Sequence, residues 1–208
     1  MKRCVIFTAY HQPGALPVFS PRAEDLLLCA DGGYALCKEM CITPHRVLGD
    51  CDSIARADIP AELLVTYPAE KDDTDTMLCI RYALEQSCDE CLLFGGIGGR
   101  LDHTLANLQS LAFAHTHGMR AGMVDACDQA FLMENEERII SYQKNTAISL
   151  LAYTERCAGV TISGVKYPLL HATLTQNFPL GVSNRCTAEY ARVAVEEGIL
   201  LVVLSSVG

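Results

Sequence analysis

Aspartates recur close to glycines and short apolar segments in the first half of the chain. In the sequence VLGDCDSI, Val47 and Leu48 precede Gly49, and Asp50 and Asp52 follow it. Carboxylates two residues apart on an extended segment point to the same side, where they repel each other unless a cation lies between them. A divalent ion with oxygen ligands is the simplest such cation. The pair therefore indicates a metal site, with a solvated acidic loop as the structural alternative.

A second acidic cluster lies at residues 71–75, KDDTD, and includes Asp72 and Asp75. Behind it, Met77, Ile80 and Leu84 recur near helical spacing, which predicts a helix from Asp75 to about residue 86. Acidic residues near a helix N-terminus stabilise the helix, and this is the structural explanation of the cluster. Three aspartates and a lysine within five residues exceed what a cap requires, which favours a role in function.

A glycine-rich segment at residues 95–99, GGIGG, lies between a predicted strand and a predicted helix. Backbone N–H groups of such a segment can approach a phosphate at the positive end of the helix, and Arg100 can add a bidentate contact. The segment fits neither GxxxxGK[ST] nor a strict GxGxxG, so it indicates a phosphate site of another kind. The helix that follows is expected to present one apolar face, formed by Leu101, Leu105, Leu108 and Leu111.

The elements that position these residues are predicted from apolar runs in the first half of the chain. Residues 3–9 and 26–30 are continuous apolar runs, as is typical of strands covered on both faces. The second run ends at Asp31, and residues 34–40 follow as a predicted short helix. This order predicts a βα unit with an acid at the carboxyl end of the strand, where ligands bind in open α/β sheets. Further strands are expected at 63–67, 91–94, 120–125 and 130–133.

The sequence pattern changes from Asn145 onward, which indicates a domain boundary near residues 138–144. Short β-rich runs such as AISLLAY and GVTISGV alternate with Gly, Pro and Asn, and helical periodicity is absent. This pattern predicts a sandwich of antiparallel sheets. The Gly, Pro and Asn clusters at 164–169 and 179–184 are expected to be turns. We therefore predict an α/β domain with a mainly parallel sheet at residues 1–138 and an all-β sandwich domain at residues 139–208.

Composition limits the classes of function. The formal charge of -9 argues against a nucleic-acid partner. No stretch reaches the roughly 20 apolar residues of a membrane span, and the apolar run near the N-terminus has the length of a strand rather than of a signal peptide. The eleven cysteines, Cys88 and Cys91 of the lone CxxC included, are expected to be free thiols. We therefore expect a cytoplasmic protein without nucleic-acid or membrane partners.

Six motifs, in this order, resemble the pattern of thiamine pyrophosphokinases, and together they span nearly the whole chain. They are ADGG at 30–33, GDCDSI at 49–54, KDDTD at 71–75, GGIGGRLDHTLANL at 95–108, GVKYPL at 164–169 and PLGVSN at 179–184. The resemblance implies an N-terminal α/β domain and a C-terminal β-sandwich in a homodimer with active sites between subunits. It also implies transfer of a pyrophosphoryl group from ATP to the hydroxyl of thiamine with Mg²⁺, giving thiamine diphosphate and AMP.

The resemblance also implies roles for individual residues. Asp50, Asp52 and Asp75 would hold the metal and the triphosphate, with Asp72 supporting them. Arg100 and the backbone of Gly98 and Gly99 would bind phosphate. The remaining expected binding residues are Asp31, Asp102 and His103 near the nucleotide, and Ser183 and Asn184 facing thiamine.

Two features leave alternatives open. The chain has no tryptophan, on which some relatives stack thiamine, so its aromatic partner for thiamine is not defined by the resemblance, and Cys51 stands where the family often has Phe. A hydroxymethylpterin pyrophosphokinase would use a similar acidic, glycine-rich half. A non-catalytic nucleotide-sensing protein is the alternative outside enzymes, although sensing does not require so many metal-capable acids.

Overall fold

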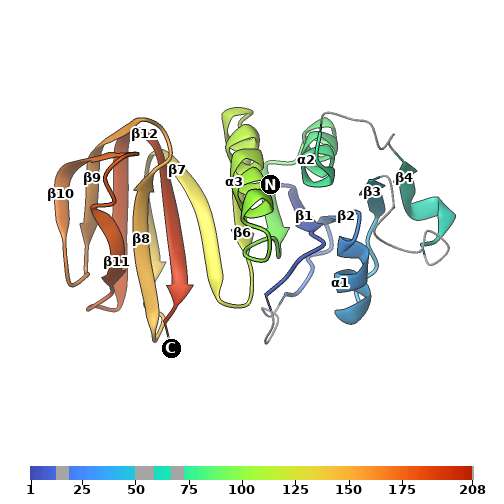
Figure 1. The fold of residues 1–208 in the computed structure, drawn as a ribbon, viewed down its shortest axis with the longest axis horizontal. Helices are drawn as coiled ribbons and strands as arrows, with labels where there is room; N and C mark the ends of the chain where they lie inside the picture. The colour runs from blue at the N-terminus through green and yellow to red at the C-terminus, as the bar shows by residue number, and fades with distance from the viewer. Residues whose placement is uncertain (13–18, 50–58, 67–72, 208) are drawn as a thin grey trace. The chain divides into compact units, whose positions relative to one another are not determined.

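The computed structural model describes residues 1–12, 19–49, 59–66 and 73–207, and these residues form two compact units, Met1–Ala126 and Cys127–Gly208 (Figure 1). The division therefore lies N-terminal to the predicted boundary at 138/139. The reason is a single long strand, β7 (Asp128–Ser141), which includes that boundary and pairs along its length with another strand of the second unit. Residues 130–133, expected to close the first domain, belong to this strand.

The first unit is built on a parallel sheet, as predicted. Its strands are β1 (Arg3–Phe7), β2 (Leu26–Ala30), β3 (Arg46–Gly49), β4 (Leu64–Thr66), β5 (Glu90–Phe94) and β6 (Arg120–Val124). Their order in the sheet is β6-β5-β1-β2-β3-β4, and every pairing is parallel. The carboxyl ends of these strands consequently share one edge, which brings the segments that follow them together.

Helices cover both faces of this sheet. Helix α1 (Gly33–Glu39) packs on the face that carries Val5, Phe7 and Val47. The alternate strand residues, such as Ile6 and Leu28, are fully buried on the other face, where α2 (Asp75–Glu85) and α3 (Leu101–Thr116) lie next to each other. Burial of both faces explains the uninterrupted apolar runs of the strands.

The buried face of α3 differs from the predicted leucine face. Leu101 and Leu105 are 73% and 52% exposed, whereas Leu111 is fully buried. The other buried residues of the helix are Asn107, Ser110 and Ala114. The buried Asn107 side chain donates to the carbonyl of Gly96 at 3.0 Å, which satisfies a polar group on the inward face of the helix.

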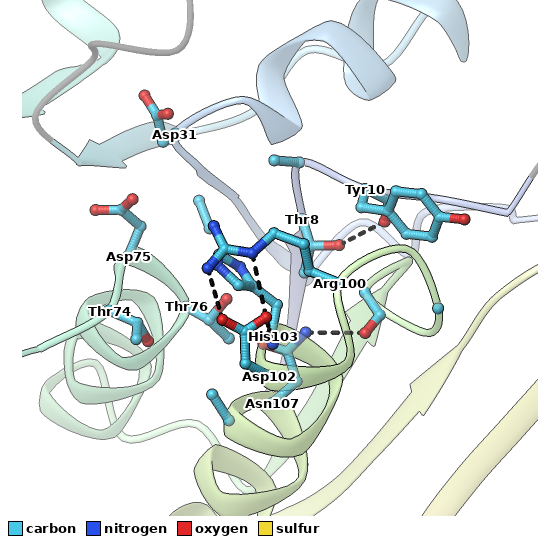
Figure 2. Close-up of a pocket in the computed structure, with 15 residues that line it drawn as sticks. Thr8, Tyr10, Asp31, Thr74, Asp75, Thr76, Arg100, Asp102, His103 and Asn107 are labelled. Carbon is cyan, nitrogen blue, oxygen red and sulfur yellow. Dashed lines mark hydrogen bonds and ion pairs between the residues drawn. The ribbon is translucent and has the colours of Figure 1, made fainter.

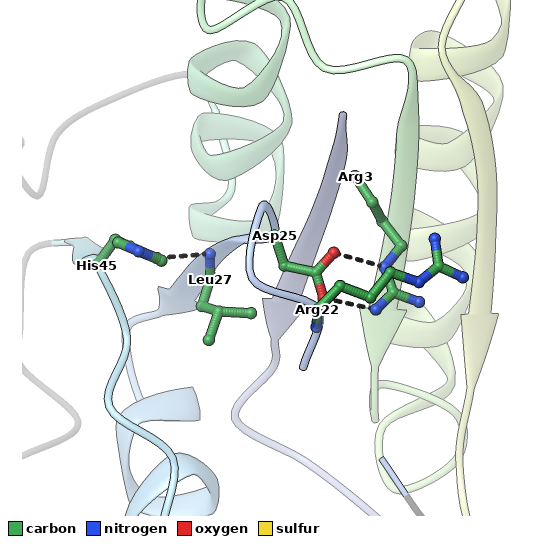
Figure 3. Close-up of polar contacts among 5 residues, drawn as sticks. All are labelled: Arg3, Arg22, Asp25, Leu27 and His45. Atoms are coloured by element: carbon green, nitrogen blue, oxygen red, sulfur yellow. Dashed lines mark hydrogen bonds and ion pairs between the residues drawn. The ribbon is translucent and has the colours of Figure 1, made fainter. Parts of the chain in front are cut away.

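An ion pair anchors the amino ends of β1 and β2 (Figure 3). Arg3 donates to both carboxylate oxygens of Asp25, with Nη2 to Oδ2 at 2.5 Å, and the backbone N–H of Arg22 donates to the same carboxylate. Burial tends to raise the pKa of Asp25, but the hydrogen bonds and positive charge of Arg3, with the Arg22 amide, lower it overall. Nearby, Leu27 N–H donates to Nδ1 of His45. These contacts lie at the end of the strands opposite the carboxyl edge.

The second unit is entirely antiparallel. Its strands are β7, β8 (Thr146–Ala152), β9 (Arg156–Ser163), β10 (Leu169–Thr175), β11 (Gly181–Arg185) and β12 (Tyr190–Ser206). Strand β12 pairs with β7 along most of its length, with β9 through its first half and with β8 through its second half. Strand β12 is thus continuous over the two apolar runs YARVAVEEG and ILLVVLS. Residues 181–185, expected to be a turn, form a strand because they pair with β8.

These pairings produce the predicted sandwich. Strands β9 and β10 extend one layer and β8 and β11 the other, while β7 and β12 belong to both. Apolar residues from five strands fill the space between the layers, among them Met133, Leu150, Val160, Leu174 and Val202. The core of this unit is therefore separate from that of the α/β unit.

Within the described residues, no helix combines the length and apolar character needed to cross a membrane. The ten described cysteines are all free thiols. Cys88 and Cys91 of the CxxC pair are buried beside Cys4.

Candidate active site

A cavity of about 590 Å³ opens at the carboxyl edge of the parallel sheet (Figure 2). It is lined from four directions: by the segments after β1 and β2, by the start of α2, and by the glycine segment with the start of α3. The lining residues are Thr8, Ala9, Tyr10, Ala30, Asp31, Thr74, Asp75, Thr76, Gly96, Gly98, Arg100, Asp102, His103, Ala106 and Asn107. The structure thus brings together five of the predicted side chains and the Gly98 backbone.

Two of the predicted acids, Asp31 and Asp75, both lie next to Gly49. A methyl group placed on Gly49 would lie 3.0 Å from Cβ of Asp31 and 3.2 Å from Oδ1 of Asp75. Asp31 is 4% exposed, and its Oδ1 is buried without a hydrogen-bond partner among the described residues. A buried carboxylate oxygen that lacks a donor is costly, so this atom is suited to a ligand that supplies positive charge.

The donor set at this place suits a hard divalent cation. Mg²⁺ prefers carboxylate oxygens and usually binds through one or two carboxylates together with waters and substrate phosphates. The unsatisfied oxygen of Asp31 beside Asp75 fits that preference. Among the residues that the structure describes, no group of three potential ligands is close enough to hold a metal. Asp50, Asp52 and Asp72 lie outside the described residues, and Asp50 follows Gly49 directly in the chain.

Arg100 and Asp102 form an ion pair at the mouth of the cavity. Arg100 Nε lies 3.1 Å from Oδ1 and Nη2 lies 2.6 Å from Oδ2 of Asp102, and both side chains are largely exposed. The Arg100 hydrogen bond lowers the pKa of Asp102, so this carboxylate is ionised and a weak proton acceptor at neutral pH. His103, also exposed, donates its backbone N–H to Asp102. Figure 2 shows the Arg100 side chain extending into the middle of the site.

The backbone of the glycine segment is largely engaged within the protein. Gly98 N–H donates to the hydroxyl of Thr104 at 3.0 Å, and Gly96 N–H donates to the carbonyl of Tyr10 at 2.6 Å. A phosphate that used the Gly98 amide would have to displace Thr104. Of the two predicted glycines, Gly98 lines the cavity, while the Arg100 side chain has the larger exposed donor set for an anion.

Tyr10 is a site residue that the sequence reasoning missed. A methyl group on Gly99 would come within 2.7 to 3.0 Å of Cε2, Cδ2 and Cζ of the Tyr10 ring, so the ring packs directly on the glycine segment. Thr8 and Asn107 were also missed. The signal for Tyr10 and Thr8 was their position at the carboxyl end of β1, the edge where ligands bind in this class of sheet.

Asp73, which shares the acidic cluster with Asp75, has a structural role. Its carboxylate accepts from Nε of Arg81 at 2.8 Å, and the guanidinium of Arg81 lies 4.9 Å from the ring centroid of Phe113. Thr74 caps α2 by accepting the N–H of Met77. Of the described acids in the cluster, Asp75 is the one that lines the cavity.

Asn184 and Ser183 lie in the second unit, on β11. The Asn184 side chain is buried, accepts the N–H groups of Tyr167 and Arg185, and donates to the carbonyl of Tyr167 at 2.6 Å. Ser183 is exposed, and its N–H donates to the hydroxyl of Ser149. Asn184 therefore holds the segment that carries Tyr167, whose ring is 61% exposed.

An open parallel sheet with an acid-lined cavity at its carboxyl edge, joined in sequence to an all-β unit, defines a two-unit α/β protein with a candidate ligand site at that edge. Comparison with known proteins gives the particular family. Residues 21–122 match the family model "Thiamin pyrophosphokinase, catalytic domain", and residues 136–200 match "Thiamin pyrophosphokinase, vitamin B1 binding domain".

Individual relatives agree with both matches. The chain is 30% identical over 187 residues to thiamine pyrophosphokinase of Bacillus subtilis, with 87% of each chain covered. A crystal structure of the B. subtilis enzyme has a TM-score of 0.86 at 27% identity and 99% coverage of each chain. The thiamin pyrophosphokinase of Geobacillus thermodenitrificans has a TM-score of 0.83 at 26% identity, with 100% of this chain and 99% of that chain covered. The chain belongs to the thiamine pyrophosphokinase family, and the predicted family membership is confirmed.

Proposed function

We propose that this protein transfers a pyrophosphoryl group from ATP to the hydroxyl of thiamine, giving thiamine diphosphate and AMP. The hydroxyl oxygen forms a bond to the β-phosphorus, the bond from the β-phosphorus to the oxygen bridging to the α-phosphate breaks, and the hydroxyl proton passes to a base. The main observation behind the proposal is that Asp31 and Asp75 both lie next to Gly49 and line the same cavity as Arg100. Membership of the family supports the same reaction.

The described residues have distinct tasks in this proposal. Arg100 exchanges its contact with Asp102 for the phosphoryl oxygens, where a guanidinium can bind two oxygens at once. Charge spreads over these oxygens during transfer, so a fixed positive group lowers the barrier. One of the aspartates at the site accepts the proton of the thiamine hydroxyl.

Asp31 and Asp75, with Asp50 and Asp52, are the proposed ligands of Mg²⁺, and Asp72 is proposed to support them. When bound, Mg²⁺ neutralises phosphate charge and orients the triphosphate. The unsatisfied Oδ1 of Asp31 is the structural observation that favours a cation at this place.

Tyr167 is the proposed aromatic partner for thiamine in this chain without tryptophan. Its ring is exposed, and Asn184 fixes the backbone on both sides of it through the Tyr167 N–H and carbonyl. The fixed backbone lowers the entropy lost when the ring stacks on a flat, cationic ligand, which would displace the Lys166 ammonium now 5.2 Å from the ring centroid. Asn184 would then act on thiamine through Tyr167, and Ser183 would remain the candidate for a direct contact.

The test is an assay of AMP formation from ATP and Mg²⁺ with either thiamine or a hydroxymethylpterin as acceptor. We expect one AMP per thiamine diphosphate, and background with the pterin. Asp75→Asn should abolish turnover, whereas Asp73→Asn, two residues away and paired with Arg81, should retain it. Turnover with the pterin alone would favour the pterin kinase, and no AMP with either acceptor would favour the nucleotide sensor. The matches to both thiamin pyrophosphokinase domains do not favour these alternatives.

A homodimer with active sites between subunits and a cytoplasmic location complete the proposal. Exposed apolar side chains of the second unit, such as Ile139, Leu170 and Phe178, are suited to an interface. The free thiols are consistent with a reducing compartment. Light scattering coupled to size exclusion should give twice the chain mass, and a monomer that is fully active would overturn the shared site.

A further inference from the structure

We propose that the ring of Tyr10 is the platform on which the purine base of the nucleotide stacks, so that the cavity binds its nucleotide at two ends of different chemistry. The inference rests on the proposed use of ATP. It assigns a substrate contact to a residue that precedes the segment matched by the catalytic family model, which begins at residue 21.

The ring of Tyr10 lies across the glycine segment. The position of a Gly99 Cβ is 2.7 to 3.0 Å from three atoms on one side of the ring, and that of a Gly98 Cβ is 3.4 Å from Cε1 and 3.5 Å from the hydroxyl oxygen. Contacts to both edges of the ring from two successive glycines mean that one face covers the backbone. Tyr10 nevertheless stays 39% exposed and lines the cavity. Part of Tyr10 is therefore accessible from the cavity, and the proposal assigns the stacking contact to the ring face opposite the glycines.

Several contacts hold Tyr10 in this position. Its carbonyl accepts the N–H of Gly96 and the hydroxyl of Thr8. Two residues later, Gln12 N–H donates to Oδ1 of Asp125 at 2.9 Å. A ring whose backbone is fixed on both sides pays little entropy on stacking, which is the property of a preorganised binding group.

The chemistry of the two ends of the cavity sets the orientation of the nucleotide. Figure 2 shows Asp31 and Asp75 on one side of Arg100 and Tyr10 on the other. The acids suit a metal-bound triphosphate. An uncharged aromatic face provides no charge to bind a phosphate, but it provides a surface on which a nucleobase can stack. Since every base has a π-face, Tyr10 should add affinity for the nucleotide without selecting adenine over guanine.

The experiment compares two ligands that share the polyphosphate and differ in the base. Calorimetry with Mg²⁺ measures the Kd of α,β-methylene-ATP, in which the bond to be broken is blocked, and of inorganic tripolyphosphate. We expect Tyr10→Leu to raise the Kd of the nucleotide analogue about tenfold and that of tripolyphosphate less than about twofold. Tyr10→Phe, which keeps the ring, should bind both ligands like the wild type.

Each other pattern overturns the inference. Equal weakening of both ligands by Tyr10→Leu means that Tyr10 acts only by supporting the glycine segment, and an equal loss in Tyr10→Phe means that the hydroxyl acts instead of the ring. If the leucine variant does not fold, Tyr10→Trp supplies an independent measurement in a chain without tryptophan. Its emission should be quenched by the analogue and unaffected by tripolyphosphate, and unchanged emission would refute stacking.

The proposed function fails separately from this inference. Binding of the analogue with the expected pattern but no AMP formed from ATP and thiamine would overturn the reaction and leave the stacking platform standing. A wild-type protein that binds no nucleotide analogue would overturn both.

Discussion

Substitution of Gly49 by alanine tests the convergence of acids most directly. The new methyl group would lie 3.0 Å from Cβ of Asp31 and 3.2 and 3.3 Å from Oδ1 and Cγ of Asp75, so one or both side chains must move by a few tenths of an ångström. Gly49 also has φ +155°, which side chains rarely adopt. We expect a loss of about 1 to 3 kcal/mol in the free energy of unfolding from strain and overpacking. Because a displacement of about 1 Å can cost roughly 10²-fold in rate, kcat/KM should fall at least about tenfold.

Gly118→Ala is the matched control for this substitution. Gly118 has φ +80°, and a methyl group there meets nothing within 4 Å, so the variant carries backbone strain without touching an acid. AMP formation is measured for both variants across a Mg²⁺ titration, and urea unfolding gives their stabilities. Gly118→Ala should lose stability but not activity. If Gly49→Ala keeps the wild-type kcat/KM and Mg²⁺ dependence, the acids at Gly49 are not the catalytic site.

Three further outcomes follow from individual contacts. Asn184→Ala removes three hydrogen bonds, two to the backbone of Tyr167 and one to the N–H of Arg185, and should cost about 2 to 3 kcal/mol in urea unfolding. It should also raise KM for thiamine and not for ATP, and an unchanged thiamine KM would contradict the role given to this segment. Arg100→Lys keeps the charge but loses bidentate binding, so kcat/KM for ATP should fall about 10²-fold with an unchanged melting temperature, and wild-type kinetics would rule out the phosphate role. Asp25 has a lowered pKa in the folded state, so the stability contributed by its pair with Arg3 is complete above the unfolded pKa of about 3.9 and is lost as the pH falls through the folded value. Asp25→Asn should therefore flatten the decline of the urea midpoint below about pH 4, and parallel curves for the two proteins would refute this.

Local patterns predicted the elements and the edge at which the site lies. The apolar runs predicted the parallel strands because both faces of such strands are buried. Placing Asp31 and Arg100 at the carboxyl edge followed from strand, glycine and helix order alone. The acid cluster before α2 was predicted to start a helix, and Asp75 does start it.

Contacts between residues distant in the sequence account for the features of the site that the sequence did not predict. The periodicity of α3 placed its leucines on one face but did not report that Leu101 and Leu105 are exposed, or that Asn107 is buried and bonds to Gly96, a contact between separate segments. Asp73 and Asp75 have equivalent neighbours in sequence, but Arg81 pairs with the first. Asn184 was assigned to the substrate by motif, whereas its side chain bonds the backbone of Tyr167, seventeen residues away.

Strand β12 pairs with three other strands of the second unit, and this determines the order in which the two units can fold during synthesis. All the parallel pairings of the α/β sheet lie within residues 1–126, so this unit can form them while later residues are still being added. The second unit cannot form its pairings early, because β7, β8 and β9 each pair with β12, near the end of the sequence. Ribosome-stalled chains that stop before Tyr190 should accordingly yield a protease-resistant fragment from the first unit and degrade from residue 127 onward.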